Sequence, residues 1–160
     1  MVSEDLPTLY PMLREVLHSK IHRATVTAAL PEYVGSITID EDWLRMVGMR
    51  VSDKVAVANC RNGARFETYV FRGEPGSKKI EVNGAAAHLV EPGDKVIIMH
   101  YALMSDDEYA GHEPKVLVMS EKGGVKETLS YKPGPAPMKT AAKKSGGKRA
   151  AATTPKKKAK

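Results

Sequence analysis

The chain has 160 residues, 42% of them hydrophobic, which predicts one domain with a single core. It has no apolar run of about 18 residues and no basic-then-apolar signal segment, so we expect a soluble, cytoplasmic protein that is not inserted in a membrane. The single cysteine, Cys60, excludes a framework of intrachain disulfides. The five histidines lack the close pairing that is typical of metal ligands, so we expect no metal.

The charge is divided unevenly along the chain. Residues 132–160 hold ten of the 25 Lys and Arg residues and none of the 19 acids, which leaves 15 basic and 19 acidic groups, a net charge of −4, on residues 1–131. The segment 132–160 is rich in Lys, Ala, Pro and Gly and has little to bury, which predicts a disordered basic tail. This tail is either a weak contact for nucleic acid or another anionic surface, or a solubilising appendage.

Alternating or β-branched runs predict a mainly β protein. In chain order, the predicted strands are 20–27, 36–39, 54–58, 68–71, 79–82 and 95–101. The turns between them are predicted at Asn62-Gly63, Asn83-Gly84 and Pro92-Gly93-Asp94. Two short helices are predicted, one between the cap Asp40 and Gly48, the other opened by a capping box from Ser105 to Glu108. Many short strands are typical of a small closed barrel, but they do not fix its topology.

One dipeptide has a chemistry of its own, Gly35-Ser36, which stands at the start of the predicted strand 36–39. The Ser36 hydroxyl can add to the carbonyl carbon of Gly35 and replace the peptide bond by an ester. Loss of the Ser36 α-proton then expels the Gly35 carboxylate, and the dehydroalanine that remains hydrolyses to a pyruvoyl group. Glycine suits the first position because it has no Cβ and tolerates unusual backbone angles. Strain held there by the fold would favour the shift.

A Gly-Ser pair alone is a weak signal, and the second pair, Gly76-Ser77, lies in a turn-rich segment that indicates a loop. The other motifs along the chain, taken together with Gly35-Ser36, are more specific. In a fixed order the chain carries MLR (12–14), KIHRATVT (20–27), YVGSITID (33–40), NGARFETY (62–69), GS (76–77), NGAAA (83–87) and PGDKVII (92–98). With these motifs at these spacings, about residues 12–119 resemble the pyruvoyl-dependent aspartate 1-decarboxylase family.

The resemblance implies a double-psi β-barrel assembled as a homotetramer, with active sites between neighbouring subunits. It implies decarboxylation of L-aspartate to β-alanine and CO2 for pantothenate and coenzyme A biosynthesis. A pyruvoyl group derived from Ser36 would form a Schiff base with the substrate amine and act as the electron sink, in place of pyridoxal phosphate. The chain would then consist of an extension at 1–11, a decarboxylase domain at 12–131 and the tail at 132–160, unless translation begins at Met12.

The resemblance also assigns roles to charged and hydroxyl side chains. Arg65 would grip the side-chain carboxylate of the substrate, with Lys20 as a second cation. Thr68 would hydrogen-bond the Gly35 carbonyl during cleavage and later contact substrate, and Tyr69 would protonate the decarboxylated carbon. Adjacent residues of an ideal strand point to opposite faces. Thr68 and Tyr69 therefore share one pocket only if the strand is bulged or ends there, or if one of them acts in a neighbouring subunit's site.

The remaining expected site residues are small, or lie near the cleavage site. Those expected to contact or support the substrate are Gly84, Ala85, Ala86 and Asn83, which by themselves would form only an Asn-Gly turn. His22 and Tyr33 match family positions near the scissile bond, and each could equally be a packed strand residue.

Two other functions compete with this one. The first is a non-enzymatic swapped-barrel regulator that binds nucleic acid through the basic tail, although the acidic remainder of the chain lacks an aromatic-basic stripe. The second is a pyridoxal-phosphate decarboxylase, for which 160 residues leave no room for the usual cofactor domain. Two bands on a denaturing gel would favour the self-cleaving enzyme over both.

Overall fold

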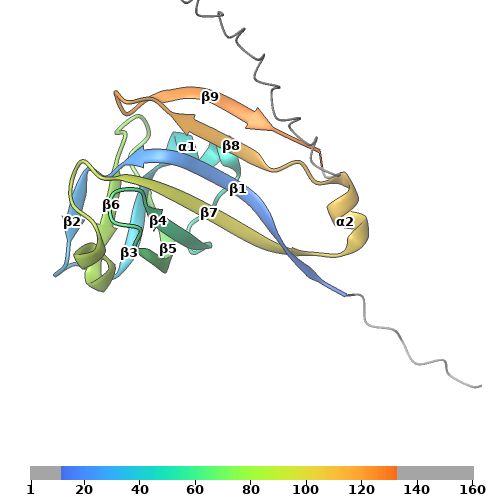
Figure 1. The fold of residues 1–160 in the computed structure, drawn as a ribbon, viewed down its shortest axis with the longest axis horizontal. Helices are drawn as coiled ribbons and strands as arrows, with labels where there is room; N and C mark the ends of the chain where they lie inside the picture. The colour runs from blue at the N-terminus through green and yellow to red at the C-terminus, as the bar shows by residue number, and fades with distance from the viewer. Residues whose placement is uncertain (1–11, 133–160) are drawn as a thin grey trace, which may run out of the picture.

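The structure is a computed structural model that describes residues 12–132 (Figure 1). Within these residues the backbone forms one mixed sheet in the order β2-β6-β3-β5-β4-β7-β1-β8-β9. The strands are β1 (Arg14–Thr25), β2 (Ala28–Leu30), β3 (Ser36–Asp40), β4 (Lys54–Asn59), β5 (Arg65–Gly73), β6 (Ile80–Asn83), β7 (Lys95–Met104), β8 (Lys115–Met119) and β9 (Val125–Ser130). The helices are α1 (Glu41–Val47), the 3-10 helix η1 (Gly84–Leu89) and α2 (Asp106–Gly111). The predicted mainly β fold with short helices is confirmed.

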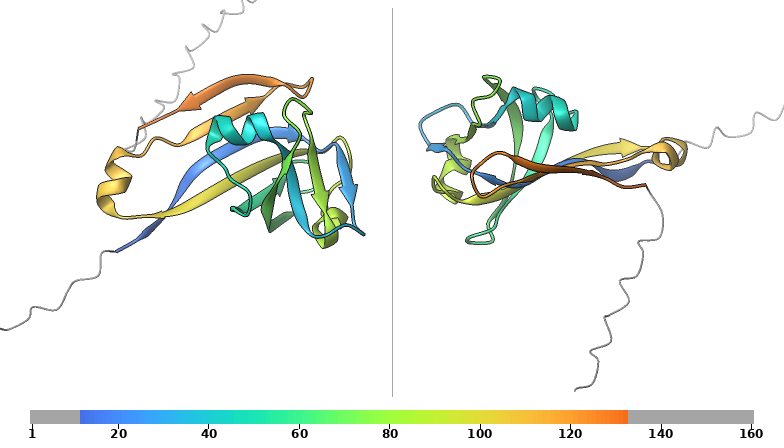
Figure 2. Two further views of the ribbon diagram at one scale, coloured as in Figure 1. Left: turned by 180° about the vertical axis from the view of Figure 1, so that it is seen from behind. Right: turned by 90° about the horizontal axis from the view of Figure 1, so that it is seen from above.

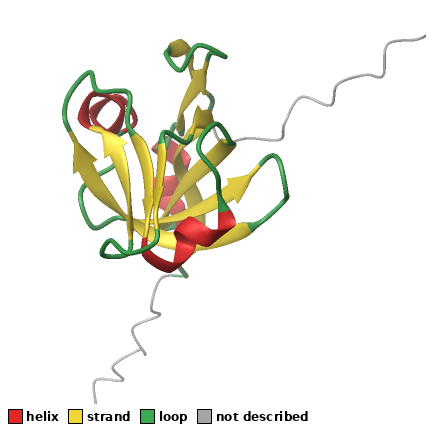
Figure 3. Ribbon diagram, turned by 90° about the vertical axis from the view of Figure 1, so that its left-hand side faces the viewer, coloured by secondary structure: helices red, strands yellow, loops and turns green. Residues whose placement is uncertain are grey.

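The sheet closes into a small barrel because β1 continues into β2. β1 pairs with β7 on one side, and β2 pairs with β6 on the other. The link between them is fixed by two backbone hydrogen bonds of 2.8 Å, from Val26 N–H to the Asp94 carbonyl and from Thr27 N–H to the Ile80 carbonyl. Figure 3 shows the strands curving round the interior. The predicted small closed β-barrel is confirmed.

β1 and β7 run on together beyond the barrel, and α2 lies at the far end of this extension (Figure 2). Their pairing continues from Thr25 opposite Lys95 to Arg14 opposite Met104, with two irregularities in register. β8 pairs in parallel with β1, and β9 pairs with β8 as the outer strand. The described residues contain no helix long and apolar enough to cross a membrane.

The barrel interior is apolar. In β4, for example, Val55 and Val57 are buried while the alternate residues are only partly covered. Burial of each such side chain contributes roughly 1.5–3 kcal/mol. The largest fully buried side chains are Ile21, Val26, Ile37, Ile39, Val47, Val55, Val57, Val70, Ile80, Val82, Ile98 and Leu117. The buried polar side chains are the exceptions: Ser19, Ser36, Asp40, Asn59, Asn83 and Asp94.

The predicted helix ends are confirmed. Asp40 accepts a hydrogen bond of 2.9 Å from the backbone of Asp42, and Gly48 ends α1 with a φ of 74°. The capping box at the start of α2 is present between Ser105 and Glu108. The Asp40 carboxylate also accepts from the backbone of Gly76 at 3.1 Å, so the second Gly-Ser pair belongs to a loop, as predicted.

One predicted turn is wrong. Asn83 is the last residue of β6, and Gly84 begins η1 with a φ of 67°, so the chain enters a 3-10 helix and not a hairpin turn. The left-handed glycine that the Asn-Gly pattern indicates is present, but it serves a different structure. The predicted extension 1–11 lies outside the described residues, as does the predicted tail apart from Lys132.

Three histidine rings cluster at the base of the extension, His18 stacked on His112 and tilted against His100. The ring centroid of His18 lies 4.8 Å from that of His100 and 5.5 Å from that of His112. His100 Nε2 lies 3.6 Å from an Asp53 carboxylate oxygen, and Lys115 adds a further positive charge. Burial, then the neighbouring His100 and His112 rings, lower the pKa of His18 below its ordinary value of 6.5.

The lowered pKa of His18 predicts acid destabilisation. Above pH 6.5 both states leave His18 neutral, whereas below it the unfolded chain binds a proton that the folded chain resists, until the lowered pKa is reached. The free energy of unfolding should therefore fall as the pH drops through 6.5, and less steeply in His18→Gln. Urea unfolding at one protein concentration between pH 8 and 5 measures this, with the exposed His88→Gln as control. Identical pH slopes for all three proteins would contradict the prediction.

Candidate active site

The Gly35-Ser36 bond lies where a loop enters the barrel. Tyr33 and Val34 are exposed by 61% and 68%, whereas Ser36, the first residue of β3, is completely buried. Ser36 pairs with Asn83 in the antiparallel register of β3 and β6. The candidate scissile bond therefore joins an accessible loop to a fixed strand.

The side chain of Asn83 holds the Ser36 hydroxyl. Asn83 Nδ2 donates to Ser36 Oγ at 2.9 Å and to Thr38 Oγ1 at 3.2 Å. Ser36 Oγ in turn donates to the Val34 carbonyl at 3.4 Å, back across the candidate scissile bond. Asn83 Oδ1 is buried and has no hydrogen-bond partner among the described residues. An unpaired buried acceptor costs about 1–3 kcal/mol, so its presence beside a hydroxyl is a mark of a functional site.

Gly84 packs directly against Gly35. A Cβ added to Gly84 would lie 2.7 Å from Gly35 Cα and 3.2 Å from the Tyr33 carbonyl oxygen, and the left-handed φ of Gly84 also disfavours any side chain. Gly35 itself does not have a positive φ, so the unusual backbone angles expected there are absent. A Cβ on Gly35 would meet Asn83 O no closer than 4.0 Å. A side chain at position 35 would therefore meet open space, whereas position 84 accommodates only glycine.

Strand β5 brings Thr68 and Tyr69 level with the same bond. β3 and β5 are parallel, with Ile37 beside Val70. Extending this register by one residue places Tyr69 level with Ser36, and extending it by two places Thr68 level with Gly35, which lies in the bend before β3. Thr68 is half-buried, on the same face of β5 as the buried Val70, and Tyr69 is 39% exposed on the other.

The register of β5 excludes two of the three explanations for how Thr68 and Tyr69 could both act in a pocket, a bulge and a strand end. β4 and β5 pair without interruption from Lys54 opposite Tyr69 to Ala58 opposite Arg65, and β5 continues to Gly73. The strand is neither bulged nor ending at Thr68 and Tyr69. These two residues therefore lie on opposite faces, at the level of the two residues that the scissile bond joins.

The two expected cations lie on different strands of the protomer. Arg65, the first residue of β5, is exposed, and Lys20 lies in β1 between Met99 and Val116 of the adjacent strands. Neither cation forms an ion pair within the described residues, which leaves both free to bind a carboxylate. The strand of Lys20, β1, does not pair with β3, the strand of Ser36.

His22 and Tyr33 occupy different settings. His22 follows Lys20 on the same face of β1, its Nδ1 is buried without a partner in residues 12–132, and burial followed by Lys20 and Arg23 lowers its pKa. Tyr33 lines an open surface pocket of about 360 Å³ with Leu30, Pro31 and Glu32, in the loop that precedes Gly35. The sequence predicts neither this pocket nor the hydrogen bond from Asn83 to Thr38.

The two alanines that follow Gly84 in η1 differ in their exposure. Ala85 is exposed, and Ala86 packs against the hydrophobic core. Residues 12–132 contain no group of three or more His, Cys, Asp or Glu side chains that could hold a metal ion.

Fold and site together define a small β-barrel protein with a buried serine at a loop-strand junction. The family model of aspartate decarboxylase matches residues 12–126. The chain is 52% identical over 122 residues to aspartate 1-decarboxylase of Bacillus subtilis (strain 168), covering 76% of this chain and 96% of that protein. It is 54% identical over 121 residues to the aspartate 1-decarboxylase of Staphylococcus carnosus (strain TM300), covering 76% and 95%. The chain belongs to the aspartate decarboxylase family, which confirms the resemblance.

Proposed function

We propose that this protein decarboxylates L-aspartate at its α-carboxylate to β-alanine and CO2, after the chain cleaves itself between Gly35 and Ser36. The observation that carries the proposal is the buried Ser36 hydroxyl, which accepts a hydrogen bond of 2.9 Å from Asn83. The preceding residue, Gly35, packs against Gly84, at a position where only glycine fits. The residues present fit a pyruvoyl group derived from Ser36, since a Cβ on Gly84 would fill the space against Gly35. The pyruvoyl group supplies a carbonyl for the substrate amine and an electron sink for the carbanion.

The chain's own residues perform the cleavage. Ser36 Oγ bonds to the Gly35 carbonyl carbon as the peptide C–N bond breaks, which leaves an ester and the free Ser36 amine. Thr68, level with Gly35, donates to the oxygen that becomes negative during this attack. Removal of the Ser36 α-proton then breaks the Cβ–Oγ bond and releases the Gly35 carboxylate. Hydrolysis of the resulting dehydroalanine with loss of ammonia completes the group.

The substrate is held through its carboxylates and protonated by a hydroxyl. Arg65 binds the side-chain carboxylate that β-alanine retains, with Lys20 as a second cation. Tyr69, exposed on the face of β5 opposite to Thr68, delivers a proton to the decarboxylated carbon in a neighbouring subunit's site. Ala85 and Ala86 line the pocket beside Gly84, and His22 and Tyr33 support it. Lys20 lies on a strand that does not pair with β3, which favours active sites between the subunits of a homotetramer.

The remaining assignments follow from this function. β-Alanine would serve pantothenate and coenzyme A synthesis in the cytoplasm. Residues 12–131 form the catalytic domain, to which the extension 1–11 and the basic tail 132–160 are appended. The tail is either a solubilising appendage or a weak, salt-sensitive contact with nucleic acid or another polyanion, in both cases separate from catalysis.

Mass spectrometry together with an assay tests the function. The purified protein should show two chains, 1–35 and 36–160, the second beginning with a pyruvoyl group, and should release β-alanine from L-aspartate. Borohydride reduction in the presence of L-aspartate should add substrate mass to the 36–160 chain alone. A single uncleaved chain after long incubation, without β-alanine, would refute the proposal.

Gly84→Ala should impair self-cleavage. The new methyl group would collide with Gly35 Cα and displace the loop that carries the scissile bond, and errors of about 1 Å can cost 10²-fold in rate. The appearance of two chains on denaturing gels measures the effect. Gly76→Ala is the matched control, because Gly76 has a similar φ of 72° and belongs to the other Gly-Ser pair, but its Cβ would meet nothing within 4 Å. Equal cleavage rates for both variants would contradict the contact argument.

A further inference from the structure

The most polar buried cluster outside the Ser36 site is centred on Asp94, which is only 6% exposed. Its carboxylate accepts hydrogen bonds from Asn59 Nδ2 at 2.6 Å, from Arg61 Nε at 2.6 Å and Nη2 at 3.1 Å, and from the Glu91 backbone at 3.0 Å. The Arg61 guanidinium holds the pKa of Asp94 down to about 2, helped by Asn59 and Glu91 and opposed by burial. The carboxylate is therefore charged and fully paired wherever an enzyme of this kind would work.

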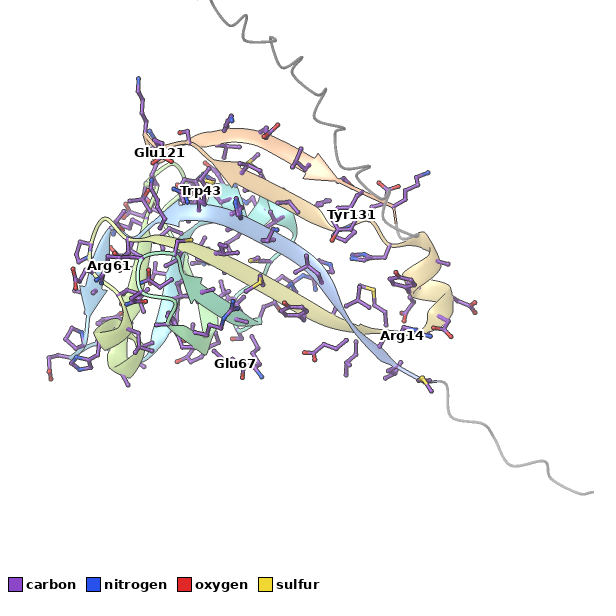
Figure 4. The ribbon with its side chains drawn as sticks, in the orientation of Figure 1. Arg14, Trp43, Arg61, Glu67, Glu121 and Tyr131 are labelled. Atoms are coloured by element: carbon purple, nitrogen blue, oxygen red, sulfur yellow. The ribbon has the colours of Figure 1, made fainter. Side chains whose placement is uncertain are left out.

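This Asp94 network, made of Asn59, Arg61, Glu91 and Asp94, joins two segments that the sheet does not pair. Asn59 Nδ2 also donates to the Leu89 carbonyl at 3.1 Å, and Asn59 Oδ1 accepts from the Arg61 backbone at 2.9 Å. Asn62 adds a second bond to Leu89 O at 3.2 Å. The turn between β4 and β5 is thereby fastened to the end of η1. In Figure 4, Arg61 lies at the end of the barrel where η1 is found.

The two fastened segments are the approaches to the proposed site. η1 begins at Gly84, in contact with Gly35, and ends at Leu89. The turn leads directly into Arg65 at the start of β5. An ion pair between a buried carboxylate and a half-exposed guanidinium, as in Asp94 and Arg61, adds little net stability, because desolvation and solvent screening offset the attraction. The barrel is already stabilised by a continuous apolar core. The main effect of the Asp94 network is therefore to fix the position of the turn between β4 and β5 relative to η1.

We propose that Asn59 and Asp94 are positioning residues for decarboxylation, which fix the loop beside Ser36 relative to the turn that carries Arg65. The proposal rests on the function proposed above. In aspartate only the Cα and Cβ atoms separate the amine from the side-chain carboxylate carbon, so the groups that hold its two ends must keep a nearly fixed separation. A shift of about 1 Å between them is enough to cost up to 10²-fold in rate.

Asp94→Asn tests the proposal with almost no change of shape. Every neighbour of the carboxylate is a donor, so either orientation of the new amide places an N–H group against another donor. Counting active sites with a hydrazine reagent for the pyruvoyl carbonyl, we expect kcat/KM per processed site to fall about tenfold, mainly through KM. Arg61→Met should lower it about threefold, and Arg61→Lys should lie between Arg61→Met and the wild type, because it keeps the charge but not the paired donors. Glu91→Gln is the control, since it removes only an exposed ion pair of 3.0 Å with Arg61.

Hydrogen exchange separates this proposal from the proposed function. In Asp94→Asn, or in Arg61→Met if Asp94→Asn fails to fold, amides of both 61–64 and 84–90 should exchange faster, while those of Val55 and Val57 stay protected. Unchanged exchange in both segments, or wild-type kcat/KM per processed site in the folded variants, would overturn the positioning role. If the wild-type protein makes no β-alanine but the two segments still loosen together, the proposed function fails while the coupling of the loops stands.

Discussion

Ser36→Ala should leave the chain in one piece and abolish β-alanine formation. The substitution removes the one oxygen that can form the ester with Gly35, while the small side chain keeps the buried strand start intact. Asn83 Nδ2 retains its bond to Thr38, so the local fold should persist. Intact mass should give the uncleaved 160-residue species, and the assay should show no turnover above background.

Ser77→Ala is the matched control for Ser36→Ala. Ser77 also follows a glycine, but its backbone N–H donates to the Glu74 carbonyl at 3.2 Å in a surface turn, and its hydroxyl meets the Lys79 backbone only at 3.4 Å. Ser77→Ala should cleave and turn over normally. If Ser77→Ala stayed uncleaved, or Ser36→Ala still gave two chains, the scissile bond would have been assigned to the wrong serine.

The strand that the sequence marks most clearly has one buried and one partly covered face. β4 alternates between buried valines and partly covered alanines, and this pattern is visible in the residue types. β9 is exposed at all but its first position, so no alternation marks it, and the three residues of β2 are too few to form a pattern. β8 pairs in parallel with β1, nearly 100 residues away in the chain, a pairing set by tertiary structure and not by local propensity.

For the candidate site, the sequence motifs predict which residues take part better than they predict which of these residues touch each other. Gly84 was expected near substrate, but its contact with Gly35 depends on how β6 pairs with β3. The bond from Asn83 to Ser36 has the same origin. The Asp94 network was missed because Pro92-Gly93-Asp94 indicates a turn whatever the Asp94 side chain does. Hydrogen bonds between residues 35 apart in the chain leave no local signal in a single sequence.

Tyr69→Phe and Thr68→Val should fail at different steps, because they lie on opposite faces of β5. Tyr69→Phe removes only an exposed hydroxyl, so the chain should still cleave itself and still be labelled by borohydride with L-aspartate. Its turnover should fall roughly 10²-fold or more, the usual scale for a lost general acid. Thr68→Val keeps the shape but removes the donor level with Gly35, so it should slow cleavage itself.

The two variants are compared by measuring cleavage and turnover separately, with turnover expressed per processed site. Tyr101→Phe is the control for hydroxyl loss, since Tyr101 is a similarly exposed tyrosine on β7 whose hydroxyl, among residues 12–132, meets only the Met99 sulfur, at 3.6 Å. If Tyr69→Phe cleaved normally and kept nearly full turnover, another group or water would be the proton donor. If Thr68→Val cleaved at the wild-type rate, the Gly35 oxyanion would need a different donor, and Asn83, which already reaches the Ser36 hydroxyl, would be the next residue to test.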